Sequence, residues 1–499
     1  MKNEKSQSCK TSASVRSKIF LISVLILIIS IIIYRLSTIG PFAPLQCRLL
    51  GIGCPDTKVQ GYVAPEFIDV KKAFIKNFKD GGEVGSSVAA YYNGKLVVDL
   101  YGGYADLETM REYNKDTLQL VFSSTKALTS IMIAYLVDRG LLNYNEKISK
   151  YWPEFAQGNK ENVTLLDLVN HRAGVTYLDT QVTKSELEDL DKLAKILAAQ
   201  PHAFDGVPLR AYHAATRGWY LNEIVRRVDP KHRTIGQIVS EEILKQYDLE
   251  FYLLLPQKLS SRVATFYHAP ITEKILLMRH LLLEWWYKKN SDPFILESID
   301  KTDFKSKAFN SSVPGIPKPF EFKEVTKLEE ITFECPSVTG ITNAKSMAKL
   351  GAIIINNGQS LDDNSNSKPL ISKNTIDLIS TKLPIEWDYF IERNLTSSVG
   401  GFVYFKLPGL EDVEFLGSGG FGGSLFIWNR ELGISFGYAM NAIKMNTFGD
   451  KRGWSVLKEI VNVVKKLKKK ELKKEQLKKE QFEDPFSKIQ MLRKLIKRS

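Results

Sequence analysis

The sequence predicts a mixed α/β protein, in which a sheet domain carries a mostly helical insert and follows one membrane-spanning helix. Three features predict this arrangement: an apolar run at 19–36, β-rich runs at 86–103 and 397–441, and a mostly helical pattern from about 160 to 380. Because strand-forming runs lie at both ends of the body, they must come together in one sheet, and the helices between them form a further layer.

The segment 19–36 is predicted to span a membrane. It begins with IFLISVLILIISIIIY and is just long enough for a transmembrane helix, which needs about 17–25 residues. More Lys and Arg precede it than follow it, so the positive-inside rule places the basic residues 1–18 in the cytoplasm and the body in a lumen or outside the cell. A cleaved signal peptide is one alternative, and a mitochondrial location is another because the leader is rich in Ser and Lys.

The cysteines and the N-x-[ST] sequons fit a lumenal or extracellular body. Residues 37–62, with scattered Gly and Pro, are expected to form a linker, in which Cys47 and Cys54 could pair in an oxidising compartment. Cys9 would be cytoplasmic, and Cys335 would remain a single buried or free thiol. Sequons that predict glycosylation of the body occur at Asn162, Asn310 and Asn394.

The body, 63–462, begins with a predicted helix, an antiparallel hairpin and a second helix. The first helix is expected from about 65 to 78, and the hairpin turns at Asn93-Gly94, the pair preferred in type I′ turns. The second helix is expected from 123 to 139, because its apolar residues recur at helical spacing until Gly140, a plausible C-cap.

The helical insert is expected at about 140–380, and the short glycine-rich strands that follow it return the chain to the sheet. The last segment, 463–499, is predicted to be a basic helical tail, because its leucines lie five residues apart and form no apolar stripe. Positions 451–499 hold 17 Lys and Arg against 6 Asp and Glu, which accounts for most of the net charge of +13. The rest of the body is close to neutral, which argues against a nucleic-acid partner.

The stretch VFSSTKALTS (121–130) contains a candidate catalytic pair at the start of the second helix. Ser123 follows the strand-like LQLVF, and Lys126 lies three residues on, on the same helix face. A lysine desolvated there could lose its proton near neutral pH and act as a base on the serine, and the helix N-terminus favours a nearby oxyanion. The alternative is a serine N-cap followed by a surface lysine, since S-x-x-K occurs four more times in the chain.

Five separated segments resemble the serine β-lactamase-like family, which includes class C β-lactamases, penicillin-binding proteins and related esterases. In chain order they are FSSTKALTSIMIAYLVDRGLLNYNEKISKYWPEF, VTLLDLVNHRAGV, AYHAATRGWYLNEIVRRV, PSVTGITNAKSMAKLGAIIINNG and GSGGFGGSLFIWNRELGISFGYAMN. The sequence looks most like the eukaryotic β-lactamase domain-containing branch. The resemblance implies a β-lactamase/transpeptidase-like fold, with an antiparallel sheet flanked by helices, and a serine hydrolase activity.

The resemblance also assigns roles to residues of this chain. Ser123 matches the acylated nucleophile, and Lys126 matches the lysine that activates it. Tyr212, in Tyr212-His213-Ala214, matches the tyrosine of the family's Y-x-N motif, which shuttles a proton to the leaving group, whereas Ala214 replaces the asparagine. On its own, Tyr212 would be interpreted as a half-buried aromatic residue at a helix start.

The family's third motif, K-T-G or H-x-G, falls on Ser418-Gly419-Gly420, so that Ser418 replaces the usual cation. In the family this strand supplies an oxyanion-hole N–H opposite that of the nucleophile, and the two donors here would be the backbone N–H groups of Ser123 and Phe421. Because a backbone donor survives a side-chain change, the hole can persist. The missing cation argues against β-lactam specificity.

Other chemistry is not supported by the sequence. GSGGFG (417–422) fits G-x-G-x-x-G, but the strand-like SLFIWN follows it instead of the helix that a dinucleotide site needs. The six histidines form no i, i+4 pair, and neither a cofactor nor a metal is expected. The sequence therefore predicts a membrane-anchored serine hydrolase acting on a small-molecule or peptide ester or amide. A catalytically inactive binding or scaffold protein of the same fold is the alternative.

Overall fold

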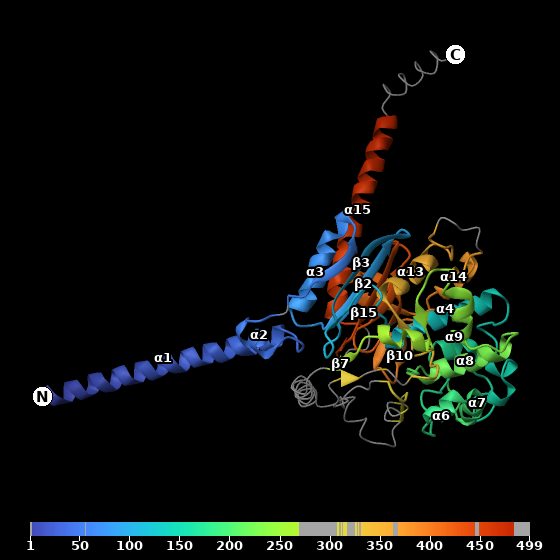
Figure 1. Ribbon diagram of the computed structural model, residues 1–499, viewed down its shortest axis with the longest axis horizontal. Helices are drawn as coiled ribbons and strands as arrows, with labels where there is room; N and C mark the ends of the chain where they lie inside the picture. Colours follow the sequence, from blue (N-terminus) through green and yellow to red (C-terminus); the bar gives the residue numbers. More distant parts are fainter. Residues whose placement is uncertain are drawn as a thin grey trace, which may run out of the picture.

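The structure of the protein is a computed structural model, shown in Figure 1. It describes residues 2–54, 56–268, 331–362, 368–444 and 449–483, together with short pieces between 307 and 328. The predicted sequon at Asn310 and the end of the basic tail, from 484 on, lie outside the described residues.

A long helix, α1 (Lys2–Thr38), projects from the folded body at the N-terminus (Figure 1). Its stretch Lys18–Leu36 has a mean hydropathy of 2.8 and none of its residues is buried, so it is long and apolar enough to cross a membrane. A short helix, α2 (Leu45–Leu50), follows, and a disulfide joins Cys47 to Cys54. The two cysteines that the sequence suggested as partners are therefore bonded.

The centre of the body is an antiparallel sheet in which the two ends of the chain meet. Its strand order is β1-β3-β2-β15-β14-β13-β12, and β4 pairs with β3. The strands are β1 (Val59–Val63), β2 (Gly85–Tyr92), β3 (Lys95–Asp106), β4 (Arg111–Glu112), β12 (Val403–Leu407), β13 (Leu410–Gly419), β14 (Leu425–Asn429) and β15 (Ile434–Met440). The early strand β2 pairs with the late strand β15, which confirms the prediction of one sheet built from distant segments.

Local predictions for the start of the body are confirmed. Asn93 and Gly94 both have positive φ, 48° and 77°, as the type I′ turn requires. The first predicted helix is α3 (Ile68–Lys79), and the second is α4 (Thr125–Asp138). Gly140 follows α4 with a φ of 73°, the left-handed conformation that commonly ends a helix.

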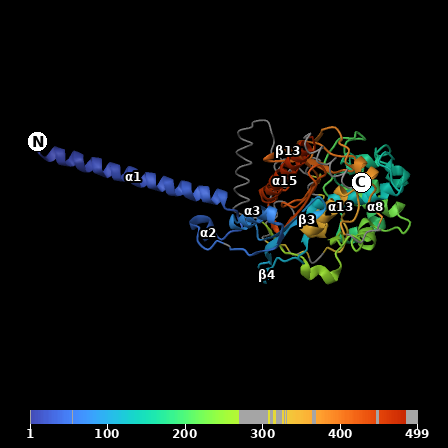
Figure 2. The same cartoon turned by 90° about the horizontal axis from the view of Figure 1, so that it is seen from above.

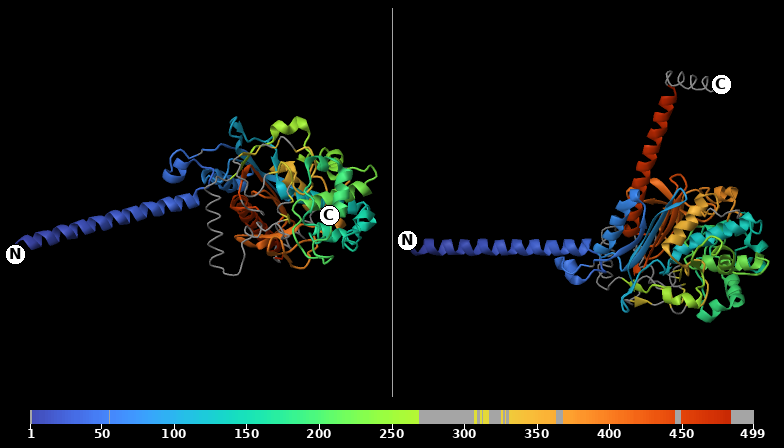
Figure 3. Two further views of the ribbon diagram at one scale, coloured as in Figure 1. Left: turned by 90° about the horizontal axis from the view of Figure 1, so that it is seen from below. Right: turned by 45° about the horizontal axis from the view of Figure 1, so that its top comes forward.

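Helices cover both faces of the sheet. On one face, α3 and α15 (Lys451–Glu483) pack apolar residues such as Phe74 and Ile460 against strand residues such as Phe436 in one buried cluster. On the other face, α13 (Ala344–Ile355) contacts β2, β14 and β15. Figures 2 and 3 show the sheet between these two layers, with the other helices of the insert beyond α13.

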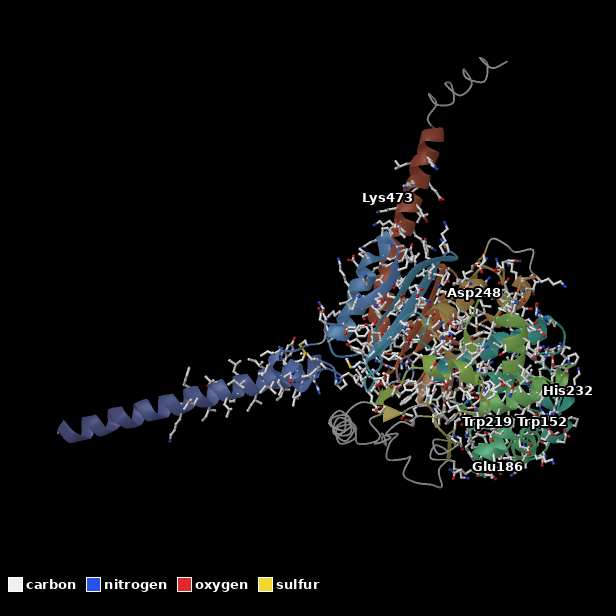
Figure 4. The ribbon with its side chains drawn as sticks, in the orientation of Figure 1. Trp152, Glu186, Trp219, His232, Asp248 and Lys473 are labelled. Carbon is white, nitrogen blue, oxygen red and sulfur yellow. A yellow bond between two sulfur atoms is a disulfide. The ribbon has the colours of Figure 1, made fainter. Side chains whose placement is uncertain are left out.

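The insert consists mainly of short helices around an apolar core. This core includes Trp152 and Trp219, which are labelled in Figure 4 and are 0% and 1% exposed. Its helices are α5 (Leu165–Val169), α6 (Lys184–Glu188), α7 (Leu190–Ala199), α8 (Thr216–Val228), α9 (Ile235–Ile238) and α14 (Lys373–Ile379). Short strands make small sheets at its border: β5 (Gln119–Leu120), β6 (Phe251–Tyr252), β7 (Phe266–His268), β8 (Val325–Thr326), β9 (Ile341–Thr342), β10 (Glu386–Asp388), β11 (Arg393–Leu395) and β16 (Ala442–Ile443).

Two expected boundaries differ from the structure. The expected linker, 37–62, contains α2 and most of β1, because β1 pairs with β3 at the edge of the sheet. The basic tail does not begin a new element at 463, since α15 continues through this position without a break. The far part of α15 is solvated, as its leucine spacing predicts: Leu472 and Leu477 are 59% and 58% exposed, and Lys473 stands clear of the body (Figure 4).

Candidate active site

Ser123 lies in a tight turn between β5 and α4. The turn is a 3₁₀ segment, Phe122–Ser124, in which Phe122 has a φ of 46°. A bulky residue rarely adopts this left-handed conformation, so surrounding contacts must hold it there. The Phe122 carbonyl oxygen accepts a 2.5 Å hydrogen bond from Thr125 Oγ1, and the Phe122 ring packs with its centre 5.4 Å from that of Phe421. These contacts hold Ser123 at the start of α4.

The side chains of Lys126 and Tyr212 meet at the Ser123 hydroxyl. Lys126 Nζ lies 3.2 Å from Ser123 Oγ, and Tyr212 Oη lies 2.7 Å from the same oxygen. Lys126 comes from the first turn of α4, whereas Tyr212 comes from the segment before α8. Lys126 Nζ also lies 4.8 Å from the centre of the Tyr212 ring. The structure thus brings together the three residues that the sequence singled out as catalytic.

Lys126 is buried among hydrogen-bond acceptors. It is 5% exposed, and its Nζ donates to the carbonyl oxygens of Ala214, at 2.6 Å, and Ser337, at 3.1 Å. Burial first, and then the positive charge of Arg217, lower the pKa of Lys126 well below its ordinary value. A neutral amine has two N–H groups, which these two carbonyls satisfy. Its lone pair is then left for the Ser123 hydroxyl.

The buried carboxylate of Asp388 holds the backbone of Tyr212. Asp388 Oδ1 accepts the backbone N–H of Tyr212 at 3.1 Å, and Asp388 Oδ2 accepts Arg210 Nε at 3.2 Å. The side chains of Arg210 and Asp388 are only 2% and 0% exposed, so both charges depend on this pairing. Burial raises the pKa of Tyr212 to about 12, so the phenol keeps its proton over the neutral range and donates it to Ser123 Oγ.

Ala214, which stands at the asparagine position of the family's Y-x-N motif, contacts Lys126 through its main chain. Ala214 has no side-chain amide, but its carbonyl oxygen accepts the shortest of the hydrogen bonds that Lys126 donates. Ala214 therefore helps to hold Lys126 through its backbone alone. His213 has a structural role, because its Nε2 accepts the backbone N–H of Val175 and its Nδ1 lies 2.5 Å from the Ala211 carbonyl oxygen.

Ser418 and Gly420 bring the end of β13 against the turn Phe122–Ser124. Ser418 Oγ donates a 2.7 Å hydrogen bond to the main-chain carbonyl oxygen of Ser123, so this hydroxyl is used within the protein. Gly420 lies so close to the turn that a Cβ there would overlap the Val121 carbonyl oxygen. Phe421, whose backbone N–H is the second expected oxyanion donor, follows Gly420 directly. Its N–H therefore lies close to the turn that carries Ser123.

Three further residues at this site were not predicted: Ser337, Arg217 and Asp388. Ser337 contacts Lys126 through its backbone carbonyl oxygen, which every residue type has, so the sequence could not point to it. Asp388 lies far along the chain in the small β10–β11 hairpin, and only the folded structure brings it to Tyr212. Arg217 lies in the part of α8 in which all residues from Thr216 to Val225 are buried, a burial that only the folded structure shows.

The G-x-G-x-x-G match has a structural role in the site. As predicted, no helix follows it: β13 ends at Gly419 and the next element is the strand β14. Arg452, at the start of α15, donates from Nη2 to the Gly422 carbonyl oxygen at 2.5 Å. The turn that carries Phe421 is therefore tied to the C-terminal helix.

Comparison with known proteins agrees with this geometry. The Beta-lactamase family matches residues 70–459, which is most of the chain. The chain belongs to this family. Over 389 residues it is 26% identical to the esterase/beta-lactamase LipL of Mycobacterium tuberculosis, a match that covers 77% of this chain and 83% of that protein.

Solved structures show the same fold. A family VIII carboxylesterase is 28% identical with a TM-score of 0.64, and the match covers 81% of this chain and 100% of that one. A penicillin-binding protein homolog from Caulobacter crescentus is 26% identical with a TM-score of 0.66 and the same coverage. These likenesses confirm the predicted β-lactamase/transpeptidase-like fold and the prediction of a hydrolase of this superfamily. The assignment to a eukaryotic branch stays a prediction.

Proposed function

We propose that the protein is a membrane-anchored serine hydrolase that cleaves an ester or amide bond through an acyl-enzyme on Ser123. One observation carries the proposal: the Ser123 hydroxyl lies between the protonated phenol of Tyr212 and the buried amine of Lys126, whose pKa is lowered. The relatives named as an esterase and a carboxylesterase support ester cleavage as the reaction.

Lys126 acts first as the base. In its neutral form it takes the proton of Ser123 as Oγ attacks the substrate carbonyl, and the resulting ammonium is held by the carbonyls of Ala214 and Ser337. Tyr212 then gives its phenol proton to the leaving group and recovers one from Lys126. Water then attacks the acyl-enzyme carbonyl, and the same proton transfers run in reverse. The acyl group leaves as an acid, and Ser123 regains its proton.

The backbone N–H groups of Ser123 and Phe421 stabilise the oxyanion of the tetrahedral intermediate. The N-terminus of α4 adds the positive end of its dipole at the same place. Because Ser418 stands where the family's third motif has a cation, this motif offers no positive charge to a substrate carboxylate, and the Ser418 hydroxyl is bonded to the Ser123 carbonyl. We therefore propose acyl esters or amides without a required carboxylate as substrates, in preference to β-lactams.

A fluorophosphonate probe, which reacts with activated serines, tests this function directly. The full chain in detergent is expected to be labelled on Ser123, and Ser123→Ala is expected to abolish the labelling. Hydrolysis measured across acyl esters, short peptides and a β-lactam then ranks the substrate classes, with an ester expected to lead. Failure of the folded protein to react with the probe at any pH would favour the inactive scaffold.

We also propose that α1 anchors the body in a lumen or outside the cell. The exposed apolar stretch of α1 and the Cys47–Cys54 disulfide, which needs an oxidising compartment, support this placement. The sequon residues Asn162 and Asn394 are exposed and so open to glycosylation. Glycosidase-sensitive mobility shifts that are lost in Asn162→Gln, Asn310→Gln or Asn394→Gln would support it, whereas protection of the protein within isolated mitochondria would favour the alternative.

A further inference from the structure

The segment Pro44–Cys54, which we call the collar, folds back onto the end of α1. Arg35 of α1 donates from Nη2 to the carbonyl oxygen of Cys47 at 2.8 Å, and from Nε to that of Arg48 at 3.1 Å. Arg48 Nη2 in turn donates to the carbonyl oxygen of Leu36 at 3.3 Å. These bonds hold the collar against the last turn of the apolar stretch of α1.

The collar exposes large apolar side chains. Leu45, Leu50 and Ile52 are 63%, 70% and 65% exposed. In α2, Cys47 and Arg48 are buried, so the helix turns these two residues inward. At a rotation of about 100° per residue, the face opposite them carries Leu45, Gln46, Leu49 and Leu50. The outward face of the collar is therefore mostly leucine.

The collar also exposes no charged side chain. Between Thr38 and Cys54 the only charged residue is Arg48, which is 7% exposed and directs its guanidinium onto α1. Exposed leucines without charges around them are unfavourable in water and mark a surface that meets another apolar phase. The interfacial layer of a bilayer is such a phase.

The length of the apolar stretch of α1 indicates the depth at which the collar meets the membrane. Its apolar stretch, Lys18–Leu36, has 19 residues, which at about 1.5 Å per residue match the ~30 Å of a bilayer's hydrocarbon core. Leu36 then lies where the hydrocarbon meets the headgroups, and the collar is bonded to Leu36 and its neighbour Arg35. Figure 1 shows α2 beside this end of α1, on the side of the body.

The chain between the collar and the anchor is also bonded to the body. Gly40 N donates to the Asp80 carbonyl oxygen at 2.5 Å, and Phe42 N donates to that of Gly81 at 3.1 Å. Ala43 is 5% exposed and packs on the same loop after α3. A change in the position of the collar would therefore move the body with it.

We propose that the collar is a lipid-binding surface, in which Leu45, Leu50 and Ile52 insert into the interfacial layer of the bilayer that α1 crosses. Through its bonds to α1 and to the loop after α3, the inserted collar holds the catalytic body in one orientation on the membrane. The inference rests on the anchoring by α1 in the proposed function, and its partner is the lipid itself.

Photo-crosslinking of the full chain in phosphatidylcholine nanodiscs tests the proposal. Benzoylphenylalanine, which reacts with nearby C–H bonds on illumination, replaces Leu45, Leu50 or Ile52 singly. Phospholipid adducts are expected at all three positions, and fluorophosphonate labelling of Ser123 shows that each variant is folded. The matched control is Leu378, which is 44% exposed on α14, away from α1 in Figure 1, and is expected to give about tenfold fewer adducts.

Ile29, in the middle of the apolar stretch of α1, separates failure of the collar from failure of the anchor. Adducts at Ile29 but not at the collar would overturn this inference and leave the anchor in place. No adducts at Ile29 either would contradict both. A second measurement needs no variant: in vesicles that contain a diazirine phospholipid, the peptide that carries the collar is expected to be labelled, and its absence among labelled peptides would also overturn the inference.

Discussion

The guanidinium of Arg217 donates a hydrogen bond of 2.7 Å to Ser130 Oγ, one turn of α4 beyond Lys126. Residues four apart share a helix face, so Arg217 brings its positive charge to the face of α4 that carries Lys126. Arg217 is fully buried, and no carboxylate among the described residues pairs with it. Its charge adds to burial in lowering the pKa of Lys126, which favours the neutral amine.

Replacing Arg217 with Gln is expected to shift the pH dependence of catalysis. Loss of the positive charge raises the pKa of Lys126, so the base stays protonated to a higher pH and the acid limb of the rate profile moves upward. At a pH below the limb, the rate falls about tenfold for every pH unit by which the limb moves. The rate of Ser123 labelling by a fluorophosphonate, followed from roughly pH 5 to pH 10, measures the limb.

Arg217→Lys is the control for this prediction, because it keeps the positive charge and is expected to leave the limb near its wild-type position. Equal shifts in the Gln and Lys variants would contradict an electrostatic role. Two other titratable neighbours do not interfere, since burial raises the pKa of Tyr212 and of Cys335 to about 12 and keeps both neutral across the range.

Tyr212→Phe removes only the hydroxyl that lies 2.7 Å from Ser123 Oγ. It is expected to lower kcat by about 10²–10⁴-fold without unfolding the protein, because the leaving group loses its proton donor. The loss should be larger for an alkyl ester than for a nitrophenyl ester, whose leaving group needs no proton. Steady-state kinetics with the two esters measures the difference, and equal losses for both would argue against proton transfer by Tyr212.

The side chains that we propose to react were predictable because each belongs to a short linear motif. Lys126 follows Ser123 by three residues, a spacing that a helix converts into proximity, and Tyr212 heads a recognisable motif. The groups that hold Lys126 were not predictable, because Ala214 and Ser337 act through carbonyl oxygens that any residue type supplies.

The sheet was predictable in outline but not in its order. β-rich runs at both ends of the body required a shared sheet, whereas the pairing of β2 with β15 depends on contacts between distant residues. Most of strand β1 was included in the predicted linker, because Gly and Pro are scattered through the stretch that precedes it. In the structure Gly61 is needed within β1, since a Cβ would overlap the Asp99 carbonyl oxygen on β3.

Ser418→Ala is expected to loosen the turn that presents the nucleophile. It leaves the Ser123 carbonyl without the hydroxyl that bonds it at 2.7 Å, which should cost about 1–3 kcal/mol of unfolding free energy. We expect kcat/KM to fall about tenfold, because one factor of ten corresponds to about 1.4 kcal/mol of lost transition-state stabilisation. Urea unfolding and ester kinetics measure both effects. Ser418→Thr keeps the hydroxyl and should behave as wild type, and unchanged stability in Ser418→Ala would contradict the role of this bond.

Asp388→Ala tests whether the buried ion pair positions Tyr212. The carboxylate accepts the Tyr212 backbone N–H and pairs with Arg210, so its loss should destabilise the protein by about 3–5 kcal/mol and lower kcat. The double variant Arg210→Met/Asp388→Leu removes both charges and should recover much of the stability. It should not recover kcat, because the Tyr212 N–H still lacks its acceptor. Unfolding curves and kinetics of the single and double variants separate the two effects, and joint recovery of stability and kcat would show that Asp388 supports the fold without positioning Tyr212.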